Sequence, residues 1–227
     1  MTFSGTSVPQ GGMGLSASLA VAGIRALNEF YDWGLDEEGV NALAYECEKV
    51  SHGTPSGIDN SCATYGTLIW FEKNMEGGKN KIEPFKAGKE ILIVLGNSGK
   101  TGNTKELVAG VRERKEASPE EYEPVFQRAE ELPKEAKIAL EEGNMEKIGE
   151  LMNENQELLR KIGVSCDELE DLIKIALDRG ALGAKLTGAG GGGLMYALVD
   201  SPEKQDEVAK AFEEKGYKAI KTTIGGN

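Results

Sequence analysis

The sequence predicts an α+β protein with two lobes, and three observations support that prediction. Strand-like segments stand towards both ends of the chain, four helical patterns follow one another between residues 104 and 178, and glycine clusters interrupt the chain in both halves. The character of the sequence changes near residues 97–103. We therefore expect an N-terminal domain over residues 1–100 and a C-terminal domain over residues 101–227.

The first half alternates between strand-like and helical patterns. Its most regular helix is predicted over Leu15–Tyr31, where Leu19, Ile24 and Leu27 recur on one side. A second amphipathic helix is predicted over residues 40–50. The remaining elements are predicted strands over residues 2–8, 67–72 and 91–95, of which the last is apolar enough to be buried on both faces.

The second half begins with predicted helices and ends mainly with strands. The helices are expected over residues 104–116, 119–142, 145–162 and 166–178. Pro133 lies inside the second of them and predicts a kink or a break there, because proline lacks the N–H group that a helix needs. The closing elements are strands over residues 184–186 and 194–199, a helix over 207–215 and a strand over 217–223.

Composition limits the partners that the chain can have. The net charge is −12, from 38 acidic against 26 basic residues, and such a surface repels nucleic acid and anionic membranes. No apolar run approaches the roughly 18 residues of a membrane span, and no signal peptide is recognisable. The three cysteines match no zinc spacing, so we expect buried or half-buried free thiols and a cytoplasmic location. The single histidine excludes a multi-histidine metal site.

The first glycine cluster lies immediately before the first predicted helix. Glycines let a backbone approach a ligand closely, and a helix N-terminus presents N–H groups and a partial positive charge. The pattern therefore predicts a phosphate-binding loop, with a strand–helix turn capped by Ser16 as the alternative. The candidate phosphate-binding residues are Gly11, Gly12, Gly14, Ser16, Ala17 and Ser18.

Acidic residues gather around a second turn. Glu48 and His52 are four residues apart, so they share a helix face at the C-terminal end of the second helix. A carboxylate there lies at the negative end of the helix dipole, which is unfavourable, and a bound Mg²⁺ would offset that repulsion. Asp59 follows a turn fixed by glycine and proline that can hold a carboxylate rigidly. A surface glutamate and a turn aspartate are the alternative interpretation.

A second cluster holds five glycines in the six positions from Gly188 to Gly193. A structural hairpin needs one or two glycines, and each further glycine adds to the entropy lost on folding. The cluster lies between two predicted strands. This pattern favours a loop whose backbone closely approaches a ligand or another loop.

These three segments, in this order, resemble the motifs of the galactokinase–homoserine kinase–mevalonate kinase–phosphomevalonate kinase (GHMP) superfamily, and most of all those of the mevalonate kinase family. The most specific part is His52-Gly53-Thr54-Pro55-Ser56-Gly57-Ile58-Asp59-Asn60, which follows Glu48. The segments Asn103-Thr104 and Lys185-Leu186-Thr187-Gly188-Ala189-Gly190-Gly191-Gly192-Gly193 match as well. The resemblance covers nearly the whole chain. It implies a two-lobed GHMP-kinase-like fold whose C-terminal domain is a ferredoxin-like α/β sandwich with a helical insert.

The resemblance also implies a role for each candidate residue. The glycine loop that ends at Gly14 binds the ATP phosphates, Ser16 and Glu48 bind Mg²⁺, and Asp59 acts on the substrate hydroxyl as a base or as its orienter. The first loop departs from the family spacing, so Ser18 is the alternative metal ligand. The residues implied near the phosphates and the substrate are Thr104, Thr187, Gly188, Ala189, Gly190 and Gly191.

The reaction implied is the ATP-dependent phosphorylation of mevalonate to 5-phosphomevalonate, a step of isoprenoid precursor biosynthesis. The alternatives are another small hydroxylated substrate and a non-catalytic or split relative. Family members begin with further strands and a lysine, whereas no lysine or arginine precedes Arg25 here. We therefore expect a truncated N-terminal domain, and either a homodimer or association with a separate N-terminal half.

Overall fold

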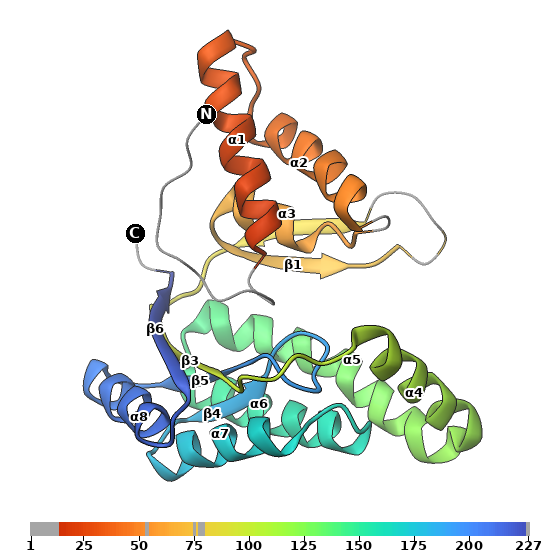
Figure 1. Ribbon diagram of the computed structural model, residues 1–227, viewed down its shortest axis with the longest axis vertical. Coiled ribbons are helices and arrows are strands. Elements are labelled where there is room, and N and C mark those ends of the chain that lie inside the picture. The colour runs from red at the N-terminus through yellow and green to blue at the C-terminus, as the bar shows by residue number, and fades with distance from the viewer. Residues whose placement is uncertain (1–13, 53–54, 75, 77–79, 226–227) are drawn as a thin grey trace. The chain divides into compact units, whose positions relative to one another are not determined.

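The computed structural model describes residues 14–52, 55–74, 76 and 80–225, with the side chains of residues 51 and 52 excepted. The chain folds into two compact units, Met1–Lys86 and Ala87–Asn227 (Figure 1). The sequence analysis placed the division near residue 100 instead. The strand at Ile91–Asn97 belongs to the second unit because it is hydrogen-bonded to two other strands of that unit.

The described part of the first unit consists of helices packed beside a short antiparallel sheet. The first two helices share a small apolar core, in which Val21 and Ile24 meet Val40 and Ala44. The elements are α1 (Leu15–Tyr31), α2 (Glu37–His52), α3 (Ile58–Tyr65), β1 (Leu68–Glu72) and β2 (Lys81–Phe85). The predicted strand over residues 2–8 lies outside the described residues.

The second unit is built on an antiparallel sheet. Its elements are β3 (Ile91–Asn97), α4 (Thr104–Ala117), α5 (Pro119–Glu142), α6 (Met145–Lys161), α7 (Asp167–Asp178), β4 (Gly183–Leu186), β5 (Leu194–Val199), α8 (Pro202–Glu214) and β6 (Lys218–Ile224). The strand order is β4-β5-β3-β6. This is the βαββαβ arrangement of ferredoxin-like folds, with four helices in its first crossover. The expected ferredoxin-like domain with a helical insert is confirmed.

One face of this sheet carries the main apolar core. Val94, Ala197 and Ala184 stand side by side on β3, β5 and β4, and all three are fully buried. Helices α7 and α8 cover this face, and Leu169 and Phe212 are among their fully buried side chains. This packing fixes the ends of the strands, and with them the loop that joins β4 to β5.

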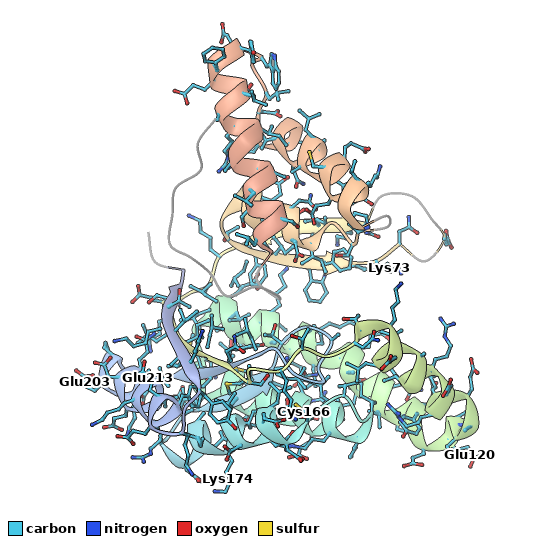
Figure 2. The ribbon with its side chains drawn as sticks, viewed as in Figure 1. Lys73, Glu120, Cys166, Lys174, Glu203 and Glu213 are labelled. Carbon is cyan, nitrogen blue, oxygen red and sulfur yellow. The ribbon has the colours of Figure 1, made fainter. Side chains whose placement is uncertain are left out.

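The outer sides of the helices of the second unit carry charged residues. Glu120, Lys174, Glu203 and Glu213 point away from the helices that bear them (Figure 2). Apolar residues therefore face the sheet and charged residues face solvent, as expected for amphipathic helices. No helix in the described part of the chain is both long and apolar enough to cross a membrane.

The three cysteines are free, and only one of them has the burial that the sequence predicted. Cys166 is partly buried, whereas Cys47 and Cys62 are exposed. The prediction of buried or half-buried thiols is therefore wrong for Cys47 and Cys62. Cys47 adjoins the buried Glu48 on α2, but successive helix residues point in different directions, so it faces outward.

Most of the predicted elements are present, and the exceptions have physical causes. Helix α5 continues through Pro133 without the predicted break, and Leu132 beside it is buried in the contact with α6. Helix α8 begins at Pro202 rather than at residue 207, because the Ser201 hydroxyl accepts from the Lys204 N–H and caps it. The sequence pattern does not predict α3 or β2.

Candidate active site

Ser16 and Glu48 meet where α1 begins, beside the last turns of α2. The Ser16 hydroxyl donates to Glu48 Oε1 over 2.8 Å, although 32 residues separate the two. Val40, Ala44 and Glu48 follow one another at helical spacing on α2, and their exposures are 3%, 0% and 4%. The face of α2 that packs on α1 therefore also carries a buried carboxylate to the first turn of α1.

Asp59 lies against the residue that precedes α1. A Cβ atom added at Gly14 would stand 3.5 Å from Asp59 Cβ and 3.6 Å from Asp59 Cγ. Gly14 has φ +60° and Gly57, before α3, has φ +88°, which is the left-handed region that glycine tolerates. These two glycines let the N-termini of α1 and α3 approach each other. Asp59 lies in the first turn of α3, where the helix dipole favours a negative charge.

Helix α3 is anchored by buried polar side chains rather than by a wide apolar face. Asn41 of α2 accepts from Asn60 Nδ2 over 2.7 Å and is also hydrogen-bonded to Ser61. Asn60 and Ser61 are 2% and 0% exposed. Arg25 of α1 donates to the carbonyl of Thr64 over 2.7 Å. The sequence analysis missed these anchors, because a helix whose buried face is polar has no apolar period to detect.

The two candidate metal serines differ in their contacts. Ser16 lies on Glu48, whereas Ser18 Oγ donates to the carbonyl of Gly14, one turn earlier in its own helix, over 3.0 Å. Ala17 between them is fully buried. Of the two serines, Ser16 is therefore the one placed beside a carboxylate. Gly11 and Gly12 of the same candidate loop lie outside the described residues.

The second glycine cluster, residues 187–193, joins β4 to β5 and rests on two other segments of the second unit. The Gly191 N–H donates to the carbonyl of Val164 over 2.8 Å, and the Gly193 N–H donates to the carbonyl of Lys100 over 2.8 Å. A Cβ atom at Gly190 would lie 2.0 Å from the Val164 oxygen, which no side chain could occupy. At Gly188, by contrast, a Cβ atom would meet nothing within 4 Å. The close approach is therefore to other loops at Gly190 and Gly191, and the loop is open at Gly188.

Thr104 begins α4 next to this glycine cluster. The Asn103 side chain caps the helix by accepting from the Lys105 and Glu106 N–H groups. Gly102 lies so close to the cluster that a Cβ atom there would be 2.3 Å from the Gly190 oxygen. The N-terminus of α4 and the cluster thus form one surface of the second unit.

Lys185 lies at the base of the same loop, and the sequence analysis gave it no role beyond its place in the matched segment. Its Nζ donates to the carbonyl of Leu186 over 2.8 Å and lies 5.2 Å from the centre of the Tyr196 ring. Burial lowers the pKa of Lys185 to about 8. A lysine inside an otherwise apolar strand was the sequence signal that could have drawn attention to it.

Each unit therefore assembles its own group of predicted site residues. The first unit brings together Gly14, Ser16, Glu48 and Asp59, which come from the starts of α1 and α3 and the end of α2. The second brings Thr104 close to the glycine cluster. The first group is made of side-chain oxygens, and the second is made mainly of backbone.

Comparisons with known proteins show the family of the chain. The model of the GHMP kinases N terminal domain matches residues 2–67, and the model GHMP kinases C terminal matches residues 136–218. Together with the fold, these matches define the class of the chain as that of the GHMP kinases.

Within that class, the chain is similar to several mevalonate kinases. The chain is 42% identical to mevalonate kinase of Thermococcus gammatolerans, over 99% of this chain and 66% of that protein. It is 34% identical to mevalonate kinase of Arabidopsis thaliana, over 98% of this chain and 62% of that protein. The crystal structure of L. major mevalonate kinase in complex with R-mevalonate superposes with a TM-score of 0.91 at 36% identity, covering 97% of this chain and 68% of that chain. The chain belongs to the mevalonate kinase family.

The chain is shorter than these relatives. It spans 62–66% of the length of the first three curated mevalonate kinases that it matches, from Thermococcus and Pyrococcus species.

Proposed function

We propose that the protein transfers the γ-phosphoryl group of ATP to the terminal hydroxyl of mevalonate, giving 5-phosphomevalonate and ADP. The observation that carries this proposal is the cluster of Ser16, Glu48 and Asp59 around Gly14 at the start of α1. The substrate is proposed from the relatives, which are mevalonate kinases, one of them in complex with R-mevalonate. Phosphoryl transfer needs positioning and charge neutralisation rather than covalent catalysis, and this cluster offers groups for both.

Ser16 and Glu48 are the proposed Mg²⁺ ligands. Mg²⁺ takes oxygen ligands at 2.0–2.1 Å in an octahedron, so two adjacent ligand oxygens stand about 3 Å apart. The 2.8 Å between Ser16 Oγ and Glu48 Oε1 fits that requirement. Mg²⁺ is usually held by one or two protein ligands and completes its shell with phosphate and water, so these two oxygens would be its protein ligands. The ion would neutralise the charge of the phosphates.

Asp59 is the proposed base or orienter of the substrate hydroxyl. It lies in the first turn of α3, and the anchored helix limits how far its side chain can move. A carboxylate within hydrogen-bond reach of the attacking hydroxyl can accept its proton as the new bond forms.

Backbone N–H groups are the proposed phosphate ligands. In the first unit they come from Gly14, Ala17 and the neighbouring residues of the first turn of α1, where a helix N-terminus favours anions. In the second unit, Thr104 and the loop from Thr187 to Gly191 are proposed to face the phosphates. The proposed donors of that loop are the N–H groups of Gly188, Ala189 and Gly190, because those of Thr187 and Gly191 already bond to Leu194 and Val164. Gly188 is the open position of that loop, which suits close approach by a ligand.

We also propose that the protein works in the cytoplasm as a homodimer. Three free cysteines support a reducing compartment. Phe30, Tyr31 and Trp33 support self-association, because they form an aromatic cluster that is 79%, 59% and 49% exposed, with Tyr31 edge-on to Phe30 and stacked on Trp33. Sedimentation of the protein and of a Trp33→Ser variant tests this: a dimer that the variant weakens is expected, and a monomer in both contradicts it.

Mevalonate-dependent release of ADP by the purified chain with Mg-ATP tests the proposed function. Asp59→Asn is expected to reduce the turnover rate about 10²–10⁴-fold, because the substrate hydroxyl loses its proton acceptor. Asp36→Asn is the matched control: Asp36 also stands at a helix start in the first unit, but it accepts from the N–H of Gly39. Turnover with another alcohol only, or equal loss in both variants, contradicts the proposal.

A further inference from the structure

Gln156 is a buried amide whose oxygen and nitrogen both form hydrogen bonds next to the glycine cluster. It lies in the middle of α6 and is 1% exposed. Its Oε1 accepts from the Leu186 N–H over 3.0 Å, and its Nε2 donates to Glu170 Oε1 over 2.9 Å and to Ser165 Oγ over 3.3 Å. One side chain therefore joins three segments: the end of β4, the loop before α7, and the first turn of α7.

Two of these partners are the points from which the glycine cluster is held. Leu186 is the last residue of β4, and the cluster begins at the next residue. Ser165 follows Val164, whose carbonyl accepts from the Gly191 N–H and leaves no space for a side chain at Gly190. Gln156 thus fixes the distance between the start of the loop and the segment on which the loop rests.

The hydrogen-bond network of Gln156 also includes an ion pair between Arg160 and Glu170. Arg160, one turn further along α6, donates to Glu170 Oε2 over 2.7 Å, and the Ser165 hydroxyl donates to Glu170 Oε1. Burial raises the pKa of the Glu170 carboxyl, but the hydrogen bonds from Arg160, Ser165 and Gln156 outweigh burial and keep this pKa below its ordinary value. Glu170 is therefore held as a carboxylate that needs donors, and Gln156 supplies one of them. Cys166, between Ser165 and α7, marks this joint in Figure 2.

We propose that Gln156 is a positioning residue for the glycine cluster. It fixes the position of Leu186, where the loop starts, relative to Val164, on which the loop rests. The loop therefore keeps one shape when substrate and nucleotide bind. This inference rests on the proposed kinase function, because it assigns the loop a part in that reaction. Gln156 itself touches neither substrate nor phosphate in this proposal.

Asn153 provides a matched control on the same helix. Its side chain makes the same kind of contact to the same strand: Nδ2 donates to the carbonyl of Leu182 over 3.1 Å, and Oδ1 accepts from the Ala184 N–H over 3.0 Å. These bonds lie at the other end of β4, away from the glycine cluster. A variant there removes a comparable contact without touching the joint at Ser165.

The test compares Gln156→Glu, Asn153→Asp and the double variant Gln156→Glu with Glu170→Gln. Gln156→Glu removes both donors and sets a second carboxylate against Glu170, so kcat is expected to fall about 10–100-fold while KM changes less. The double variant exchanges donor and acceptor across the same contact and is expected to recover most of kcat. Asn153→Asp is expected to lower the melting temperature and to leave kcat within about twofold.

Hydrogen exchange separates this inference from the proposed function, because it needs no turnover. The Gly191 amide is expected to exchange at least tenfold faster in Gln156→Glu than in Asn153→Asp, and the double variant is expected to restore its protection. Equal exchange in both single variants would overturn the inference, whatever the activity. An inactive parent chain with the expected exchange pattern would contradict only the proposed function.

Discussion

The two units hold their candidate site residues by different means. In the first, Ser16, Glu48 and Asp59 are side chains carried by helices that pack through a small core. In the second, the site is a stretch of backbone whose glycines fit between other loops and rest on a large core. A site of side chains can lose one group and keep its shape, whereas a site of backbone changes shape with any added atom. The first unit should therefore be sensitive to charge and the second to volume.

Gly190→Ala should produce the largest effect on stability. It tests whether the second unit is sensitive to added volume. The new Cβ atom would lie 2.0 Å from the Val164 oxygen at a residue with φ +86°. We expect a loss of about 3–5 kcal/mol in the free energy of unfolding, because clash and backbone strain add. Urea denaturation measures this.

Gly188→Ala is the control, since it has φ +76° but nothing within 4 Å of the new atom. Backbone strain alone should then cost about 1–2 kcal/mol. Equal losses in the two variants would mean that contact with Val164 does not shape the loop.

Glu48→Gln tests whether the first unit is sensitive to the loss of a charge. The amide keeps the shape of the side chain but removes its charge, so the affinity for Mg²⁺ is expected to fall about 10–100-fold, with a smaller change in melting temperature. Turnover against Mg²⁺ concentration measures this affinity.

Glu46→Gln, two residues away on α2, is the matched control. Glu46 is exposed and pairs with Lys49 over 2.6 Å, so its loss should leave the Mg²⁺ dependence unchanged. A Glu48→Gln variant that unfolds instead would place that carboxylate among the supports of the fold, and the contrast between the units would fail.

The smallest expected effect is the pH dependence of stability caused by Lys185, a buried lysine of the second unit. Burial lowers its folded pKa to about 8, below that of an unfolded lysine, so the unfolded chain binds more protons between these values. Stability should therefore rise with pH across this window, by about 1–3 kcal/mol between pH 7 and pH 10 relative to Lys185→Met.

The comparison should stop near pH 10, because burial also raises the pKa of the neighbouring Tyr196 to about 12. Above pH 10 that tyrosine contributes in the opposite direction. Lys174→Met, which removes an exposed lysine on α7 and leaves Lys185 in place, should keep the slope. A slope that persists in Lys185→Met would assign the pH dependence to other groups.

Local patterns predicted most elements of the fold. The apolar period of α1 gives the observed bounds Leu15–Tyr31, and the apolar run of β5 gives Leu194–Val199. The patterns failed where local sequence and burial disagree. Helix α3 hides polar residues against Asn41, and β2 contains Pro84 and two charged residues, so neither has the composition of a buried element.

The candidate site could be predicted as a set of residues but not as a geometry. Spacing and family resemblance singled out Ser16, Glu48 and Asp59, and their roles remain predictions. The 2.8 Å contact between Ser16 and Glu48 depends on how two helices pack, which no local pattern contains. Gln156 left no signal, because a glutamine in the sequence of an amphipathic helix usually faces solvent.

The contacts that α6 makes along β4 have a consequence for assembly. Asn153 and Gln156 accept from the outward N–H groups of Ala184 and Leu186, which a further strand would use, and Asn153 also donates to the carbonyl of Leu182 just before β4. Gly149 lets the helix backbone approach so closely that a Cβ atom there would lie 2.5 Å from the Leu182 oxygen. The β4 edge is therefore shielded from strand exchange and fibril growth. Within the described sheet, any extension has to start at β6, where the exposed, charged Lys218 opposes it.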